Sequence, residues 1–230
     1  MIDIRWLGRI DYQAAWQLQG QLSRDRAAGR IPDTLLLLEH PPTFTLGRSA
    51  RPEHVLIDEP ARTAKGIALY EVDRGGDVTY HGPGQLVGYP ILHLPSYGLD
   101  YRGYLRQLEA VIMQTLAAFA QPAFREPGYT GVWVPAGEQS GLRSAKIAAI
   151  GVKVDAAGIT SHGFAINLDP DLGYFDLIIP CGLRHCLVTS LARERNQPVD
   201  MDTFRLKLID TFTTIFVANC QHPKKLIADG

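Results

Sequence analysis

The chain has 230 residues, of which 46% are hydrophobic and 20% are charged, a composition typical of a folded globular protein. This composition excludes wholesale disorder and collagen-like sequence, and the length suffices for a core that needs no disulfide or metal ion. The formal net charge of −1 gives no electrostatic argument for nucleic acid or an anionic membrane as a partner. We expect one domain over residues 1–230, without a membrane-spanning helix or a signal peptide.

Short strands and one helix are predicted in the N-terminal part of the chain. Polar and apolar residues alternate over residues 2–7, which is typical of a strand. Asp11 is a candidate N-cap for a helix whose apolar residues recur at helical spacing, with Gly29 as its end. Further strands are expected over residues 35–40, 43–46 and 67–72.

The remaining chain contains two long predicted helices and several strands. Glycine and proline interrupt a β-rich stretch over residues 79–94, and Asp100 begins the helix with the clearest apolar stripe. A final helix begins at Asp200 or Asp202. Three more strands are expected between these helices, at residues 131–134, 146–154 and 159–168. The pattern predicts an α+β (mixed α/β) fold with a central mixed, mostly antiparallel sheet flanked by helices.

Three cysteines, Cys181, Cys186 and Cys220, are too few for a secreted disulfide framework, so a cytoplasmic location is expected. His185 and His222 lie near cysteines, but their spacing does not match the paired ligands of a zinc site, and we expect no metal ion. Cys186 and Cys220 are expected to have a packing role. A serine hydrolase is disfavoured, because the chain has no Gly-x-Ser-x-Gly turn.

Residues 74–85 read Arg-Gly-Gly-Asp-Val-Thr-Tyr-His-Gly-Pro-Gly-Gln, a segment rich in glycine and in hydrogen-bond donors. Because glycine has no Cβ, the backbone can approach a bound group closely. The alternative is a glycine-rich hairpin with polar surface residues. Neither Gly-Lys-Ser/Thr nor Gly-x-Gly-x-x-Gly occurs in the segment, so it does not indicate a loop that binds nucleotide phosphates.

Residues 146–154 form an expected strand with a lysine in an unusual position. Strict alternation places Lys146 on the more apolar face, with Ala148 and Val152, and Lys153 on the opposite face. A lysine on an apolar face either extends its ammonium to water at the strand end or has a function, and the sequence alone favours the first alternative. Lys153, next to a turn, is expected to be solvated surface.

Cys181 lies in a constrained segment, Ile-Ile-Pro-Cys-Gly-Leu at residues 178–183. An unpaired cysteine is commonly a small buried hydrophobic residue, and this reading stays open for Cys181. The alternative is a reactive thiol, because proline and glycine restrict the backbone and leave one side open. Lys146, or else His81 or His162, would then activate the thiol.

Taken together, these segments resemble the octanoyltransferases of lipoate synthesis, also called lipoyl(octanoyl) transferases. Residues 74–89 match the family pattern Arg-Gly-Gly-x-x-Thr-aromatic-His-x-x-Gly-Gln-x-x-x-Tyr at every fixed position. Lys-Ile-Ala at 146–148, His-Gly-Phe-Ala-Ile-Asn at 162–167 and Pro-Cys-Gly at 180–182 follow in the family's order. One departure is Ile179, where some relatives have asparagine.

The resemblance implies that Cys181 is the nucleophile and Lys146 the group that activates it, in a fold similar to the catalytic domains of biotin and lipoate ligases. An ammonium about 4 Å from the sulfur stabilises the thiolate by roughly 4 kcal/mol at an effective dielectric constant of about 20, enough to lower the thiol pKa towards neutrality. The resemblance also assigns residues to the acyl site: Arg74, Gly75, Gly76, Asp77, Val78, Thr79, Tyr80, His81, Ala149, Ile150, Gly151, Gly163, Phe164 and Ala165.

The implied reaction is the first step of endogenous protein lipoylation. An octanoyl or lipoyl group would pass from acyl-carrier protein, through a thioester on Cys181, to a specific lysine of a lipoyl domain. The implied acceptors are the lipoyl domains of 2-oxoacid dehydrogenase complexes and the glycine cleavage H-protein, with no cofactor and with the enzyme as a monomer. Two alternatives stay open: an ATP-dependent lipoate or biotin ligase, which needs no thiol, and a non-catalytic acyl-binding module.

Overall fold

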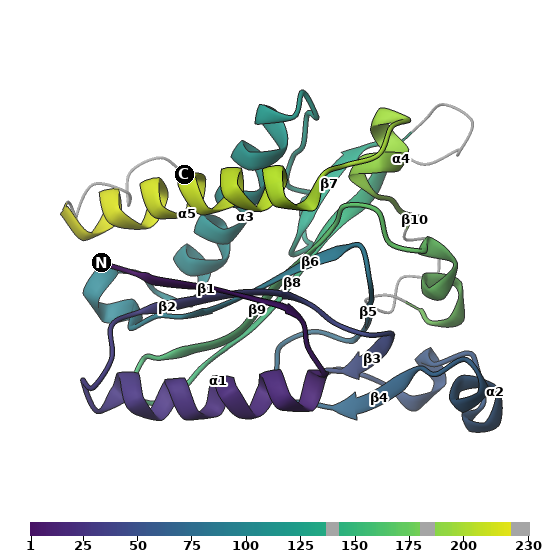
Figure 1. Cartoon of the computed structure of the whole chain (residues 1–230), viewed down its shortest axis with the longest axis horizontal. Helices are drawn as coiled ribbons and strands as arrows, with labels where there is room; N and C mark the ends of the chain where they lie inside the picture. The colour runs from purple at the N-terminus through teal and green to yellow at the C-terminus, as the bar shows by residue number, and fades with distance from the viewer. Residues whose placement is uncertain (137–142, 180–186, 222–230) are drawn as a thin grey trace.

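The computed structural model describes residues 1–136, 143–179 and 187–221, which form a 7-stranded sheet with helices on both faces (Figure 1). Its strands are β1 (Asp3–Arg9), β2 (Thr34–Glu39), β6 (Gln85–Ile91), β7 (Val132–Pro135), β8 (Ser144–Val154), β9 (Thr160–Asn167) and β10 (Leu187–Val188). The strand order is β1-β2-β6-β9-β8-β10, with β7 paired to β8. The β1–β2 and β8–β10 pairs are parallel and the others antiparallel, which confirms the predicted mixed sheet.

Three long helices cover the sheet. α1 (Tyr12–Ala27) lies on one face, and α3 (Tyr101–Ala118) and α5 (Met201–Gln221) lie on the other (Figure 1). Each begins near its predicted start, because an aspartate side chain accepts a hydrogen bond from a backbone N–H in the first turn. The capping residues are Asp11, Asp100 and Asp200. Within the described ranges no helix is both long and apolar enough to cross a membrane.

The apolar run of β2 explains why both faces of the sheet are covered. Leu35 and Leu37 belong to the core beneath α3 and α5, whereas Leu36 and Leu38 belong to the core beneath α1. All four side chains are fully buried. A strand buried on both faces needs a continuous run of apolar residues rather than an alternating one.

A 3-stranded sheet packs beside the large one, with the order β4-β3-β5. It consists of β3 (Thr43–Leu46), β4 (Ala68–Glu71) and β5 (Val78–His81). The predicted β-rich stretch over residues 79–94 therefore divides between the two sheets, since β5 belongs to the small sheet and β6 to the large one. The glycine-rich segment thus lies where the two sheets meet.

Several short elements were not predicted, because one or two turns carry no readable periodicity. These are α2 (Glu59–Ala64), α4 (Leu191–Arg195), and the 3₁₀ turns η1 (Pro52–His54), η2 (Leu94–Tyr97) and η4 (Leu172–Leu177). The two-residue strand β10 was missed for the same reason. β10 matters for the site, since Val188 pairs directly with Lys146 of β8.

Candidate active site

A cavity of about 320 Å³ lies beside the part of β8 that extends beyond its pairing with β7. The β7 pairing ends at Ala148, and the glycine-rich segment approaches β8 further along, where the N–H of Gly75 donates to the carbonyl of Val152 at 3.0 Å. Every residue that the resemblance assigns to the acyl site, except Tyr80, lines this cavity, and so does Lys146. The assigned residues that line it are 74–79, His81, 149–151 and 163–165.

Two glycines of the cavity wall are required by close packing. A Cβ on Gly151 would lie 2.9 Å from the carbonyl oxygen of Gly75, so glycine lets the two segments meet. A Cβ on Gly163 would lie 2.0 Å from the carbonyl oxygen of Gly88 on β6. Gly163 is therefore required by the packing of β9 against β6, whatever it contributes to the room for a ligand.

A β-bulge places Lys146 on the cavity side of β8. Val132 of β7 pairs with Ala148 and the next residue, Trp133, pairs with Lys146, so Ile147 is an extra residue in β8. Ile147 and Ala148 both enter the core beneath α3 and α5, and Lys146 lines the cavity. The alternation that grouped Lys146 with the apolar face is therefore wrong, because it assumed an unbroken period of two.

The Lys146 side chain is buried, with 6% of its surface exposed, so its ammonium does not extend into bulk water. Its Nζ lies 5.3 Å from the ring centroid of Trp133, within the range of a cation–π interaction. On another side lies Gly131, at φ +127°, where a Cβ would be 2.8 Å from Cε of Lys146. The sequence-favoured alternative, in which this lysine reaches solvent at the strand end, is thus wrong.

Cys181 lies outside the described residues, as do His185, Cys186 and His222, which were considered as metal ligands together with Cys220. The chain on both sides of this segment is described. Before it, Ile178 pairs with Val55, and the N–H of Ile179 donates to the carbonyl of His54 at 2.8 Å. After it, Leu187 and Val188 pair with Ala145 and Lys146. Among the described residues no group of three or more possible metal ligands is found.

His81 is held neutral in a buried hydrogen-bond network. Burial lowers its pKa to about 3, and the nearby His40 acts in the same direction. The Gln85 amide N–H₂ donates to the Tyr80 carbonyl at 3.1 Å and to Asn167 Oδ1 at 2.9 Å, so Gln85 Oε1 must accept from His81 Nδ1 at 2.8 Å. His81 Nε2 then faces the Thr45 hydroxyl at 3.5 Å as an acceptor. This geometry gives His81 a fixed tautomer with both ring nitrogens engaged.

Arg74 lies close to His81, since both side chains contact the hydroxyl of Thr45. Its guanidinium is buried and donates to the carbonyl of Thr45 at 2.6 Å, to the Thr45 hydroxyl at 2.9 Å and to the carbonyl of Gly75 at 3.0 Å. Gly47 is required beside it, because a Cβ there would lie 2.8 Å from an Arg74 guanidinium nitrogen. Arg74 thus fixes the glycine-rich segment against β3 as well as lining the cavity.

Asp77 lines the cavity, but both of its carboxylate oxygens have partners within the protein. Oδ2 is 2.6 Å from His54 Nδ1, and Oδ1 accepts the N–H of Val78 at 2.7 Å. His54 also holds the chain that precedes Cys181, through its carbonyl and Ile179. Asp77 therefore connects the glycine-rich segment to that chain.

Tyr80 is the one assigned residue that does not reach the cavity. Its side chain points to the opposite side of β5, where its ring stacks on Tyr174 with centroids 4.7 Å apart and meets the edges of Phe44 and Phe175. A Cβ on Gly82 would collide with the Tyr80 ring. The alternation along β5 explains this placement, since the side chains of Thr79 and His81 occupy the other face.

His162 lies at the end of the cavity away from Lys146, since it pairs with Val152 of β8. Its Nε2 is 2.8 Å from Oδ1 of Asp73, whose other oxygen binds Lys153. Burial raises the pKa of Asp73, but the hydrogen bonds from Lys153 and His162 outweigh it and hold the pKa at about 2. Lys153 is therefore part of a charged cluster and not plain solvated surface.

Aromatic residues complete the cavity, and most were not singled out from the sequence. Tyr12 stacks on His81 with ring centroids 5.9 Å apart, and burial raises its pKa to about 12. Tyr101 and Tyr129 are exposed at the cavity rim. Tyr89 belongs to the glycine-rich pattern, and its hydroxyl is 2.8 Å from His40 Nε2. No local pattern distinguishes the other three from ordinary packing residues.

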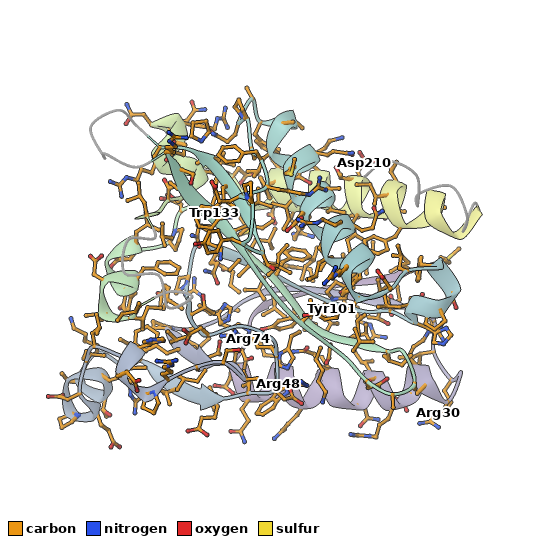
Figure 2. All side chains as sticks on the ribbon, turned by 180° about the vertical axis from the view of Figure 1, so that it is seen from behind. Arg30, Arg48, Arg74, Tyr101, Trp133 and Asp210 are labelled. Carbon is orange, nitrogen blue, oxygen red and sulfur yellow. The ribbon has the colours of Figure 1, made fainter. Side chains whose placement is uncertain are left out.

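Figure 2 labels Trp133, which pairs with Lys146 of β8, and Arg74, whose neighbour Gly75 bonds to Val152 further along β8, at separate positions. The cavity therefore has two different ends. The lysine end contains Lys146, whose ammonium lies over the ring of Trp133. The arginine end contains Arg74 and His81, which share the hydroxyl of Thr45 as a partner.

Comparison with known proteins agrees with the fold and with the family resemblance. Residues 11–213 match the family model of the lipoyl protein ligase A/B catalytic domain. An octanoyltransferase of Chloroflexus aurantiacus is 49% identical, over 94% of both chains. A bipartite lipoate protein ligase of Thermoplasma acidophilum superposes with a TM-score of 0.68 at 19% identity, over 94% of this chain and 84% of its own. Biotin protein ligase of Aquifex aeolicus gives a TM-score of 0.58 at 13% identity, over 96% and 72%.

Proposed function

The chain belongs to the lipoyl protein ligase A/B catalytic family as an octanoyltransferase of lipoate synthesis, and we propose that it acts through an acyl thioester on Cys181. It is therefore an acyltransferase, with an acyl donor and lipoyl-domain acceptors. The finer proposal has the donor as octanoyl-acyl-carrier protein and Lys146 as the group that activates the thiol. The observation that carries it is the burial of the Lys146 ammonium in the wall of the cavity.

The proposed reaction has two steps. The Cys181 thiolate attacks the carbonyl carbon of the octanoyl thioester, a new thioester forms, and the carrier's thiolate leaves and takes up a proton. The ε-amine of the acceptor lysine then attacks the acyl-cysteine, an amide forms, and the Cys181 sulfur leaves. The amine loses one proton in this step, and Lys146 is proposed to accept it, having given its own proton to the carrier's thiolate in the first step.

The network at the arginine end supports a lysine rather than a histidine as the partner of the thiol. His81 is neutral, and its two ring nitrogens are engaged by Gln85 and Thr45. His162 is bound to Asp73 at the far end of β8. Lys146, in contrast, pairs through its backbone with Val188, which follows the cysteine segment in the chain.

Intact-protein mass spectrometry after mixing with octanoyl-acyl-carrier protein tests the proposal. The expected result is a gain of one octanoyl group that peptide mapping locates at Cys181. Cys181→Ser should abolish the gain, and Cys186→Ser is the matched control that should retain it. An octanoyl group found on another residue, or no adduct in the native protein, would contradict the proposal.

The same assay separates the alternative functions. An ATP-dependent ligase would modify a lipoyl domain when given octanoic acid, ATP and Mg²⁺ without any carrier. A non-catalytic module would bind the acyl carrier and remain unmodified. The proposal also has residues 1–230 acting as one catalytic unit, a monomer in the cytoplasm without a cofactor, on the lipoyl domains of 2-oxoacid dehydrogenase complexes and on the glycine cleavage H-protein.

A further inference from the structure

Glu109 is a fully buried carboxylate in the middle of α3, where its neighbours Leu108, Val111 and Ile112 are core residues. Its Oε2 accepts hydrogen bonds from Nη1 of Arg106 at 2.7 Å and from Nε of Arg125 at 2.8 Å. Burying a carboxylate is unfavourable unless it is paired, and a leucine here would serve the core alone. Core packing of α3 therefore does not explain why a carboxylate occupies this position.

Those contacts converge on the loop between α3 and β7. Arg125 lies in this loop and also donates to the carbonyl of Arg106 at 3.1 Å. At the end of the loop, the N–H of Gly131 points to Glu109 Oε1 at 3.4 Å. Between these two anchors, residues 128–130 line the cavity. Glu109 thus holds the loop at both ends of the part that forms a cavity wall.

The same loop forms the surface against which Lys146 lies. Gly131 contacts the end of the lysine side chain so closely that a Cβ would be 2.8 Å from its Cε. Trp133, two residues later, places its ring 5.3 Å from the lysine Nζ. Tyr129 in turn packs against Trp133 with ring centroids 6.0 Å apart. A shift of the loop would move groups that pack against the Lys146 side chain.

We propose that Glu109 is a positioning residue of the transfer reaction, which fixes the loop 125–131 and thereby both the site of Lys146 and the width of the acyl cavity. This inference rests on the proposed function, since Lys146 matters only if it acts on the acyl-accepting thiol. Glu109 touches neither substrate nor thiol in this scheme. Its effect passes through Gly131 and the cavity wall.

The chain contains a matched control for this role. Asp33 is also a buried carboxylate, with Arg26 Nε at 2.6 Å, the N–H of His93 at 3.0 Å and the Tyr97 hydroxyl at 2.5 Å. None of these four residues lines the cavity. Asp33 and Glu109 therefore share their chemistry and burial, and differ in what they anchor.

The experiment compares Glu109→Gln with Asp33→Asn in the full chain. Both variants should have a lower melting temperature, because each loses a buried charged partner of an arginine. Only Glu109→Gln should slow single-turnover octanoylation of Cys181, by about 10- to 100-fold, since small misplacements of a reacting group have effects of this size. It should also raise the decanoyl-to-octanoyl rate ratio by at least about threefold, and shift the alkylation profile of Cys181 towards a free thiol, near pH 8.5.

If Glu109→Gln does not fold, Arg125→Gln provides the same test. The Arg125 side chain is partly exposed, so its replacement removes no core residue. It should change the same quantities in the same direction, by about threefold. A Glu109→Gln protein that melts earlier but matches the native rate, chain preference and alkylation profile would overturn the inference alone. A native protein that never acylates Cys181 would overturn the proposed function and the inference with it.

Discussion

The two ends of the cavity hold buried cations in contrasting surroundings. At the arginine end, Arg74 donates to a carbonyl, a hydroxyl and another carbonyl, and the adjacent His81 is neutral with both nitrogens engaged. At the lysine end, Lys146 lies over an aromatic ring and beside a glycine. The first arrangement fixes a shape, because a planar guanidinium with several bonds cannot move without breaking them. In the second, a buried amine lines the cavity wall, which is where the proposed role in proton transfer requires it.

The largest effect is expected at the lysine end. Lys146→Met keeps the aliphatic part of the side chain and removes the ammonium, so kcat for octanoyl transfer should fall by about 10²- to 10⁴-fold. Lys153→Met is the matched control on the same strand. It removes a partly exposed ion pair with Asp73 and should change kcat by less than about threefold. An equal loss of kcat in the two variants would contradict a special role for Lys146.

His81 at the arginine end and His40, whose ring centroid lies 5.7 Å from that of His81, should make stability depend on pH. Burial lowers the pKa of His40 to about 4 and that of His81 to about 3, so the folded protein binds these protons less well than the unfolded chain does. Stability is therefore fully present above about pH 6.5 and is lost as the pH falls below it.

Between about pH 7 and pH 5, each of these histidines should lower the free energy of unfolding by about 2 kcal/mol. Urea unfolding at a series of pH values measures the loss, and His40→Gln should reduce it by about 2 kcal/mol. A stability that stays flat over this range would show that the two histidines accept protons in the folded state.

Arg74→Gln should act mainly on stability. Losing the charged hydrogen bonds to Thr45 and Gly75 should lower the free energy of unfolding by about 2–3 kcal/mol. Arg48→Gln is the control, since Arg48 is exposed and its Nε makes one bond, to the carbonyl of Asp73. It should change stability by less than about 0.5 kcal/mol. An Arg74 variant of native stability that is inactive would instead assign Arg74 to the substrate.

The smallest effect is expected for Asp77, which the resemblance assigned to substrate binding. Because both of its oxygens are engaged by His54 and Val78, Asp77→Asn should leave KM for the octanoyl donor within about twofold of the native value. A double-mutant cycle with His54→Asn should give a coupling energy of about 1 kcal/mol in unfolding. A large rise in KM without coupling would favour a direct contact with the donor.

The elements of this fold were readable because their signals are local. Asp11, Asp100 and Asp200 each cap a helix with a clear apolar periodicity, and the run of leucines in β2 reports burial on both faces. The segments of the candidate site came from the family pattern, and the structure brings the residues assigned to the acyl site, other than Tyr80, to one cavity with Lys146. Their roles stay predictions, since Cys181 lies outside the described residues.

Other features depend on long-range contacts that no local pattern reports. The extra residue Ile147 is visible only in the register between β7 and β8. Alternation separates Tyr80 from Thr79 and His81, but which face of β5 meets the cavity is decided by packing against Phe44 and Phe175. Glu109 resembles a surface residue of an amphipathic helix until Arg125 and Gly131, far along the chain, are seen to meet it.

The bulge in β8 divides this strand into two stretches. Odd-numbered positions face the core before the bulge, and even-numbered positions face it directly after the bulge. Before Ile147, Ala145 faces the core and Lys146 the cavity, whereas beyond it Ala148 faces the core and Ala149 the cavity. A larger side chain at position 149 would therefore fill the ligand space, and the same change at position 148 would disturb the helix layer. Inserting or deleting one residue here would swap the core-facing and cavity-facing side chains of the strand, which no single substitution does.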